Sequence, residues 1–234
     1  MEITQGRALL EEVSMQKNPK RKLIIAAIHL FSEHGVNSVS LRMINREAGQ
    51  KNNSALHYHF GNKLGLIEAM GSFIQDHFNA IRAPRLAALE ESVADGSVTL
   101  HQLLELVVEP YAEIIDAYDW GYSSVRTLAR MEFNQDEEVL SLSRNAYTDA
   151  AQGIARLVHP LVPELPAREF NKRINFWVSS LVRDFANYRA LHMSYFGNLK
   201  PKSLAELHNF HVEMGMAVLK APDRLPDSGS LRAP

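Results

Sequence analysis

Side chains suited to contacts with DNA are concentrated in one short stretch near the N-terminus. Asparagine can bond to two atoms on the edge of adenine and arginine to two atoms of guanine, so Arg42, Asn52 and Asn53 are candidates for reading bases. Other polar residues in the stretch could contact bases or phosphates, although isolated polar residues on a helix more often face solvent alone. The complete set of candidates is Lys20, Ser40, Arg42, Lys51, Asn52, Asn53, Ser54, His57, Tyr58, His59 and Lys63.

The charge of the chain favours the same stretch. The whole chain carries a net charge of −2, yet seven basic residues stand against two acidic ones between residues 18 and 65. The remainder of the chain is therefore acidic. A basic segment on an acidic body is typical of a protein that meets phosphate with one end only. Lys20, Tyr58 and Lys63 are the candidates for phosphate contacts, and Lys63 also stands at the start of a helix.

Three short helices are expected to position these side chains. The first begins at Asn18, with a proline in its first turn, and stops at Gly35. Ser40 can cap the second helix, which ends at Gly49, and the third ends before Asn62, the cap of a longer helix. A glycine-containing turn between the second and third helices is typical of a helix-turn-helix unit, whose last helix can enter the major groove.

Three blocks of residues in this stretch carry a family resemblance. They are Arg21-(x4)-Ala26-Ala27-(x2)-Leu30-Phe31-(x3)-Gly35, Ser40-(x)-Arg42-(x)-Ile44-(x3)-Ala48-Gly49, and Ala55-Leu56-His57-Tyr58-His59-Phe60-(x2)-Lys63-(x2)-Leu66. Together they resemble the signature of TetR-type transcriptional regulators. The resemblance implies an all-α protein with an N-terminal three-helix helix-turn-helix domain and a C-terminal helical domain for ligand binding and dimerisation. It also implies a homodimeric repressor that binds a palindromic operator in double-stranded DNA.

The stretch departs from the family pattern at three places. One residue more than usual separates Gly49 from the aromatic block, so the register of the base-reading residues is open and Asn52 is an alternate for Asn53. Asn45 stands where a small apolar residue is usual, and His57 stands where a tyrosine is common. The prediction of the fold does not depend on these positions.

Beyond this stretch the apolar spacing is helical throughout, which predicts a second helical domain. The expected limits are a flexible arm at 1–18, the helix-turn-helix domain at 19–65, a sensor and dimerisation domain at 66–221 and a disordered tail at 222–234. The expected helices are Lys63 to Arg82, Pro84 to Val93, Thr99 to Asp119 with a break or kink at Pro110, Gly121 to Phe133, Asp136 to His159, Ala167 to His192, and Ser203 to Lys220.

The last two long helices are the expected dimer interface. An apolar stripe on the first of them consists of Phe170, Ile174, Trp177, Leu181, Phe185 and Tyr188. Most such stripes face the core of their own chain. In TetR-type proteins, however, the corresponding helices form a four-helix bundle with their copy, and we favour a homodimer through this stripe.

A small-molecule effector is expected to bind between Thr99 and His159. The candidate contacts are Leu104, Tyr111, Ile114, Tyr118, Trp120, Tyr122, Arg126, Arg130, Phe133 and Tyr147, any of which could be ordinary core or surface. Their mostly apolar character favours a hydrophobic effector, although its identity is open. His208 and His211 have the spacing of a ligand pair, but no third ligand accompanies them, so neither a metal nor a cofactor is expected.

Two other classes of function are open: an all-helical enzyme with a hidden site, and a constitutive DNA-binding protein without a ligand. An enzyme is not expected, because the chain has no cysteine, no phosphate-binding glycine loop and no nucleophile elbow. No apolar run reaches the length of about 18 residues that a membrane span requires, and no secretory signal is recognisable. These absences predict a cytoplasmic protein with no membrane partner.

Overall fold

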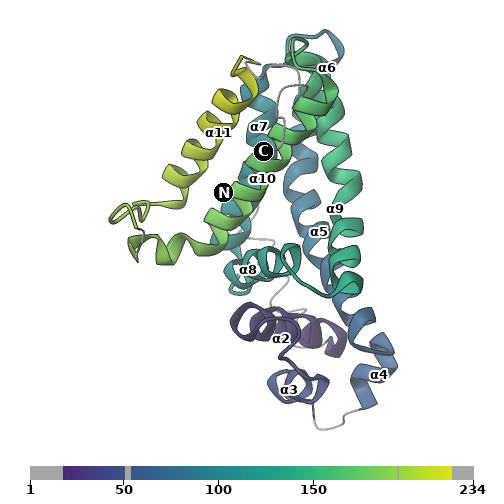
Figure 1. The fold of residues 1–234 in the computed structure, drawn as a ribbon. Coiled ribbons are helices and arrows are strands. Elements are labelled where there is room, and N and C mark those ends of the chain that lie inside the picture. Colours follow the sequence, from purple (N-terminus) through teal and green to yellow (C-terminus); the bar gives the residue numbers. More distant parts are fainter. Residues whose placement is uncertain (1–17, 51–53, 194, 223–234) are drawn as a thin grey trace, which may run out of the picture.

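Every regular element of the computed structural model, which describes residues 18–50, 54–193 and 195–222, is a helix (Figure 1). The elements are α2 (Pro19–His34), α3 (Leu41–Glu47), α4 (Ser54–Phe60), α5 (Lys63–Ala88), α6 (Glu90–Ala94), α7 (Leu100–Ala117), α8 (Gly121–Glu132), α9 (Glu137–Val158), η1 (His159–Leu161), α10 (Ala167–Asn187), η2 (Tyr188–Met193) and α11 (Leu204–Lys220). The prediction of an all-α fold is confirmed.

Local capping signals set the ends of the first helices. The Asn18 side chain accepts hydrogen bonds from two N–H groups in the first turn of α2, at 3.0 and 3.3 Å. Gly35 ends α2 with a φ of 80°, which glycine adopts without steric cost. Ser40 caps α3 by accepting from the N–H of Met43 at 3.3 Å. The predicted starts of both helices are therefore confirmed.

The three N-terminal helices share a small core with the start of α5. Each helix contributes one apolar face, and the fully buried side chains include Leu23, Ile28, Phe31, Ile44 and Leu56. Burial of each such side chain stabilises the fold by about 1.5–3 kcal/mol. The helix-turn-helix pair is therefore held by α2 behind it, and its other face is left for solvent.

The C-terminal helices pack around Trp177 of α10. Its ring is 1% exposed, and its indole N–H donates to the carbonyl of His211 in α11 at 2.9 Å. A Cβ on Gly215 would lie 2.7 Å from this ring and 3.0 Å from a methyl group of Leu104 in α7. Glycine at position 215 therefore allows α7, α10 and α11 to approach one another closely.

A proline inside α5 corrects one prediction. We expected a new helix at Pro84, whereas α5 continues through it to Ala88 and only the short α6 follows. Proline removes one backbone donor and crowds the preceding turn. The carbonyl that loses its partner at Pro84 is that of Ala80, whereas the guanidinium of Arg85 donates to the neighbouring carbonyl of Ile81 at 2.7 Å. The φ of about −65° that proline imposes is a helical value, so the helix can continue past the lost bond.

A second proline, Pro110, lies within α7, which is also continuous. Because proline has no N–H, the carbonyl of Leu106 loses its partner in the helix. Arg82 of α5 donates from Nε to this carbonyl at 3.1 Å. Burial lowers the pKa of Arg82, although the charge of Tyr111 opposes this effect. The two proline-containing helices are therefore joined by a side chain that replaces a missing backbone bond.

The apolar stripe of α10 is buried within its own chain, which corrects the expected dimer contact. The stripe residues with at most 2% exposure are Phe170, Trp177, Leu181 and Phe185. They pack against other helices of the same chain, as the ring contact of Phe185 with Tyr111 at 5.8 Å illustrates. Ile174 and Tyr188 are half-buried. Spacing identifies an apolar face but not the element that covers it. The helix also ends at Asn187, earlier than expected, and continues as η2.

Some predicted segments lie outside the described residues. Apart from Asn18, the predicted arm is outside them, and so is the predicted tail apart from Pro222. The limits of the two domains therefore stay predictions. Among the helices that the structure describes, none has the length and apolar character needed to cross a membrane.

Candidate DNA-binding interface

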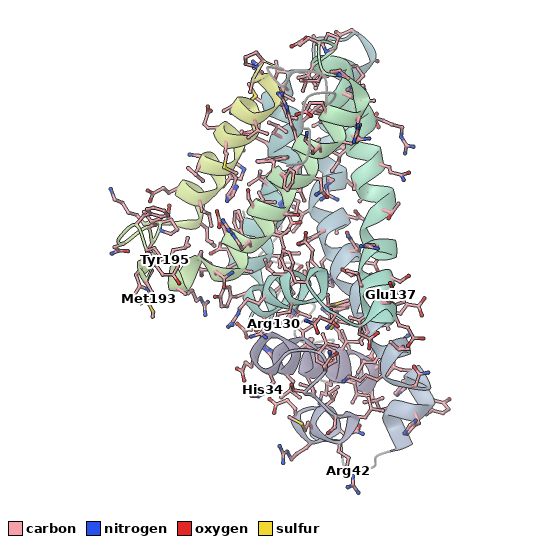
Figure 2. All side chains as sticks on the ribbon, viewed as in Figure 1. His34, Arg42, Arg130, Glu137, Met193 and Tyr195 are labelled. Carbon is pink, nitrogen blue, oxygen red and sulfur yellow. The ribbon has the colours of Figure 1, made fainter. Side chains whose placement is uncertain are left out.

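The helix-turn-helix pair α3 and α4 lies at the tip of the molecule, away from α11 (Figure 1). Figure 2 shows Arg42 of α3 at this tip, directed away from the body of the protein. Its side chain is exposed. Ser40 is also exposed, but its hydroxyl oxygen already accepts the capping hydrogen bond of α3. The tip therefore presents a guanidinium fork to an incoming ligand, next to a fixed helix N-terminus.

The C-terminal half of α4 carries three of the predicted contacts. Tyr58 is 87% exposed, and the ring of His59 meets it edge to face with centroids 5.2 Å apart. His57 has a structural role, because its Nδ1 lies 2.7 Å from the carbonyl oxygen of Gly61 and donates to it. This bond closes the end of α4, where Gly61 has a φ of 72°.

The two lysines predicted to contact phosphate lie over aromatic rings. The Nζ of Lys20 is 5.8 Å from the ring centroid of Phe60, and the Nζ of Lys63 is 5.8 Å from that of Phe31. Burial lowers the pKa of Lys63, and the charge of Asp136 partly offsets this effect. Lys63 is half-exposed and also packs against Phe31. Lys20 is exposed at the start of α2.

The turn between α3 and α4 carries the remaining candidates. Lys51, Asn52 and Asn53 lie outside the described residues, as does the side chain of Ser54. The choice between Asn52 and Asn53 as the base-reading residue therefore stays a prediction.

The DNA-binding helices are attached to the C-terminal domain by α8 as well as by α5. Thr127 of α8 donates to the carbonyl of Ile28 at 3.0 Å, and the Ser123 hydroxyl lies 3.1 Å from Nδ1 of His29. Arg130 donates to a backbone carbonyl near the end of α2 at 3.3 Å. Sequence reasoning missed this junction. The polar residues at 123, 127 and 130 recur at helical spacing, which was the available signal.

The predicted effector contacts do not form one cluster. Leu104, Tyr111, Ile114 and Trp120 are buried in the core. Tyr118 stacks on Trp120 with centroids 4.8 Å apart, and both rings contact His77 of α5 at 5.2 and 4.9 Å. The side chain of Tyr147 lies outside the described residues.

The other four predicted effector contacts lie on or after α8. Arg126, Arg130 and Phe133 line an open groove of about 650 Å³ at the junction with the DNA-binding helices. Tyr122 lies beside them, with its ring 5.7 Å from the guanidinium of Arg126. The structure therefore brings together three of the predicted contacts at the surface, and separates them from the buried aromatic rings.

The two histidines of α11, His208 and His211, lie in different surroundings. No group of three metal-ligating side chains occurs in the part of the chain that the structure describes. His211 is fully buried, and its Nε2 lies 3.3 Å from a carboxylate oxygen of Asp184. His208 instead lies 3.1 Å from the side-chain oxygen of Asn209. The two rings thus have different partners.

Two family models match the chain. That of the bacterial regulatory proteins of the tetR family matches residues 23–70, and that of the tetracyclin repressor-like C-terminal domain matches residues 105–211. The chain is 26% identical over 170 residues to the HTH-type transcriptional regulator BetI of Proteus mirabilis strain HI4320, covering 65% of this chain and 82% of the relative.

Solved structures share the fold. The fatty acid degradation regulator FadR from Bacillus halodurans has a TM-score of 0.61 at 13% identity, with 86% of this chain and 98% of that chain covered. NalD, the secondary repressor of the MexAB-OprM multidrug efflux pump in Pseudomonas aeruginosa, has a TM-score of 0.51 at 18% identity, with 86% and 96% covered. The matched models span both domains, and they are models of regulatory proteins rather than enzymes. The chain belongs to the TetR family of transcriptional regulators.

Proposed function

We propose that this regulator represses transcription by binding a palindromic operator as a homodimer, and that a small, mostly hydrophobic ligand releases it. The observation that carries the proposal is the placement of α3 and α4, with exposed Arg42 and Tyr58, at the free tip of the molecule (Figure 2). Of the candidate residues, Arg42 and one of Asn52 and Asn53 would read bases, and Lys20 would bind phosphate.

Exposed apolar side chains support the homodimer through α10 and α11. Phe176 of α10 is 66% exposed and Phe210 of α11 is 55% exposed, in contrast to the buried stripe of α10. The segment between the two helices adds Met193, Tyr195, Phe196 and Leu199, each more than half exposed. A second copy would cover these side chains, since large exposed apolar patches usually mark interfaces.

The α8 junction supports release by a ligand. A ligand that shifts α8 would displace α2 through the hydrogen bonds of Thr127 and Ser123, and with α2 the whole DNA-binding domain. In a dimer the two copies of the last helix of the helix-turn-helix, α4, must match half-sites about 34–36 Å apart. A small shift of either copy therefore lowers the affinity for the operator. A tenfold loss of DNA affinity requires about 1.4 kcal/mol of coupling.

Footprinting of the purified protein on the DNA upstream of its own gene and adjacent genes tests the proposal. We expect a single protected region with twofold symmetry, and a dimer by sedimentation at the same concentration. Weak, uniform protection of any duplex would instead favour a DNA-binding protein without sequence preference. A monomer, or an asymmetric half-site, would contradict the homodimer.

A further inference from the structure

The groove at the domain junction gathers arginines around an exposed aromatic ring. Its walls come from the α2–α3 turn, α8, the α8–α9 loop and the end of α10, and it measures about 650 Å³. The ring of Phe133 is 69% exposed. Arg126, Arg130 and Arg183 surround the same space. Figure 2 shows Arg130 at this junction, between α8 and α2.

Two of the three arginines lack a carboxylate partner among the described residues. Arg130 donates to the carbonyl oxygen of Glu33 at 3.3 Å, and Arg126 lies over the ring of Tyr122 at 5.7 Å. Neither contact neutralises a positive charge. A guanidinium that faces a groove without a counter-charge can bind a carboxylate or phosphate through two parallel hydrogen bonds.

Two acidic side chains near the groove have partners of their own. Asp184 lies 3.3 Å from the guanidinium of Arg183 and balances its charge. Glu132 accepts a hydrogen bond from the Ser179 hydroxyl at 2.6 Å, which ties it to α10. The wall also contains four small or apolar residues, Gly35, Val36, Ala129 and Ala186. The remaining side chains are polar and uncharged and can donate further hydrogen bonds: Asn37, Ser38, Asn134, Gln135 and Asn187.

We propose that this groove binds an organic anion with an apolar group. The acidic group bonds to Arg126 and Arg130, and the apolar group covers Phe133. The site is separate from the buried aromatic rings at Tyr118 and Trp120. Its occupant touches the α2–α3 turn and α8 together and competes for the hydrogen bond between Arg130 and the carbonyl of Glu33. Binding itself does not depend on the proposed repressor function, and only its effect on DNA affinity does.

The fluorescent probe 8-anilinonaphthalene-1-sulfonate combines a sulfonate with aromatic rings and tests this site on the full chain without DNA. We expect one probe per chain, with affinity that falls as salt is added. The double variant Arg126→Gln/Arg130→Gln and the single variant Phe133→Ser should each weaken binding about tenfold. Arg156→Gln removes an exposed arginine from α9 and should leave binding unchanged.

Lysine variants separate loss of the site from loss of the fold. Arg126→Lys/Arg130→Lys keeps both charges and should retain part of the affinity, and thermal melting of each variant checks folding. Wild-type affinity in the glutamine double variant, or in Phe133→Ser, would overturn the proposal. A uniform loss of operator affinity with unchanged probe binding would assign the arginines to DNA phosphates, which also overturns it. Failure of the wild-type protein to bind DNA would contradict the proposed function alone.

Discussion

The Arg42 side chain stands at the tip of α3, where its fork of N–H donors matches the two acceptors of guanine. We expect Arg42→Ala, and Asn53→Ala or Asn52→Ala, to lose about 1–3 kcal/mol of discrimination between the operator and its single-base variants. Fluorescence anisotropy on a panel of such duplexes measures this loss. Lys20→Ala is the matched control, because a phosphate contact should weaken all duplexes alike. Full selectivity in both asparagine variants would show that the predicted register is wrong.

Tyr111 gives a prediction on the dependence of stability on pH. Burial raises its pKa to about 12, from an ordinary value of 10.0. The folded state therefore favours the neutral phenol, and this stabilisation is complete below pH 10 and is lost as the pH rises to about 12. Tyr111→Phe should remove up to about 2–3 kcal/mol of this alkaline loss. Chemical unfolding at a series of pH values measures it, and Tyr58→Phe, on an exposed residue, is the control. Equal alkaline slopes in Tyr111→Phe and the wild type would contradict the prediction.

Single residues were predictable from sequence where their role is local. Asn18 and Ser40 cap helices as expected, because the signal lies within three residues of the bond that each makes. The role of His57 at the end of α4 depends on the conformation of Gly61, which spacing alone does not reveal. The partners of Thr127 and Arg130 lie on α2, far away in sequence, so their contacts could not be derived from helical periodicity.

Among the helices, the prolines show where sequence reasoning reached its limit. A proline is a sound local signal for a helix end, yet α5 continues through Pro84 at the loss of one backbone hydrogen bond. At Pro110 the donor comes from Arg82 in another helix. The apolar stripe of α10 is a similar case, since its periodicity was correct and only the partner that covers it was wrong. The bond from Arg82 to the Leu106 carbonyl and the covering of the stripe both depend on tertiary packing.

The link between α5 and α7 can be tested by a double-mutant cycle. Arg82→Met leaves the Leu106 carbonyl without its donor and should cost about 1–3 kcal/mol of unfolding free energy. In a Pro110→Ala background, the backbone N–H of residue 110 can bond to that carbonyl, so the same substitution should cost less. Urea unfolding of the four proteins measures the difference. Equal costs in both backgrounds would show that Arg82 does not replace the missing bond.

At the scale of the whole molecule, two helices connect the tip to the C-terminal domain. α5 is continuous with the DNA-binding unit along the chain, and α8 is attached to α2 by side-chain hydrogen bonds. A rearrangement of the C-terminal helices can therefore change the position of the tip by two routes. Thr127→Val removes the donor to the Ile28 carbonyl, while its similar shape preserves the packing. We expect this variant to weaken the attachment of α2 to α8.

The final prediction concerns the second copy of the chain. Phe176→Ser/Phe210→Ser should convert the protein to a monomer at micromolar concentration, because the two rings lie on the exposed faces of α10 and α11. A monomer can contact one half-site only, so operator affinity should fall by about 100-fold or more and become insensitive to the spacing between half-sites. Phe133→Ser removes a similarly exposed ring that is not carried by α10 or α11 and should leave the dimer intact. Sedimentation and anisotropy on operators of altered spacing measure both effects. A double variant that stays dimeric and retains its preference for spacing would place the interface elsewhere, while a monomer with undiminished operator affinity would mean that one helix-turn-helix domain is sufficient for recognition.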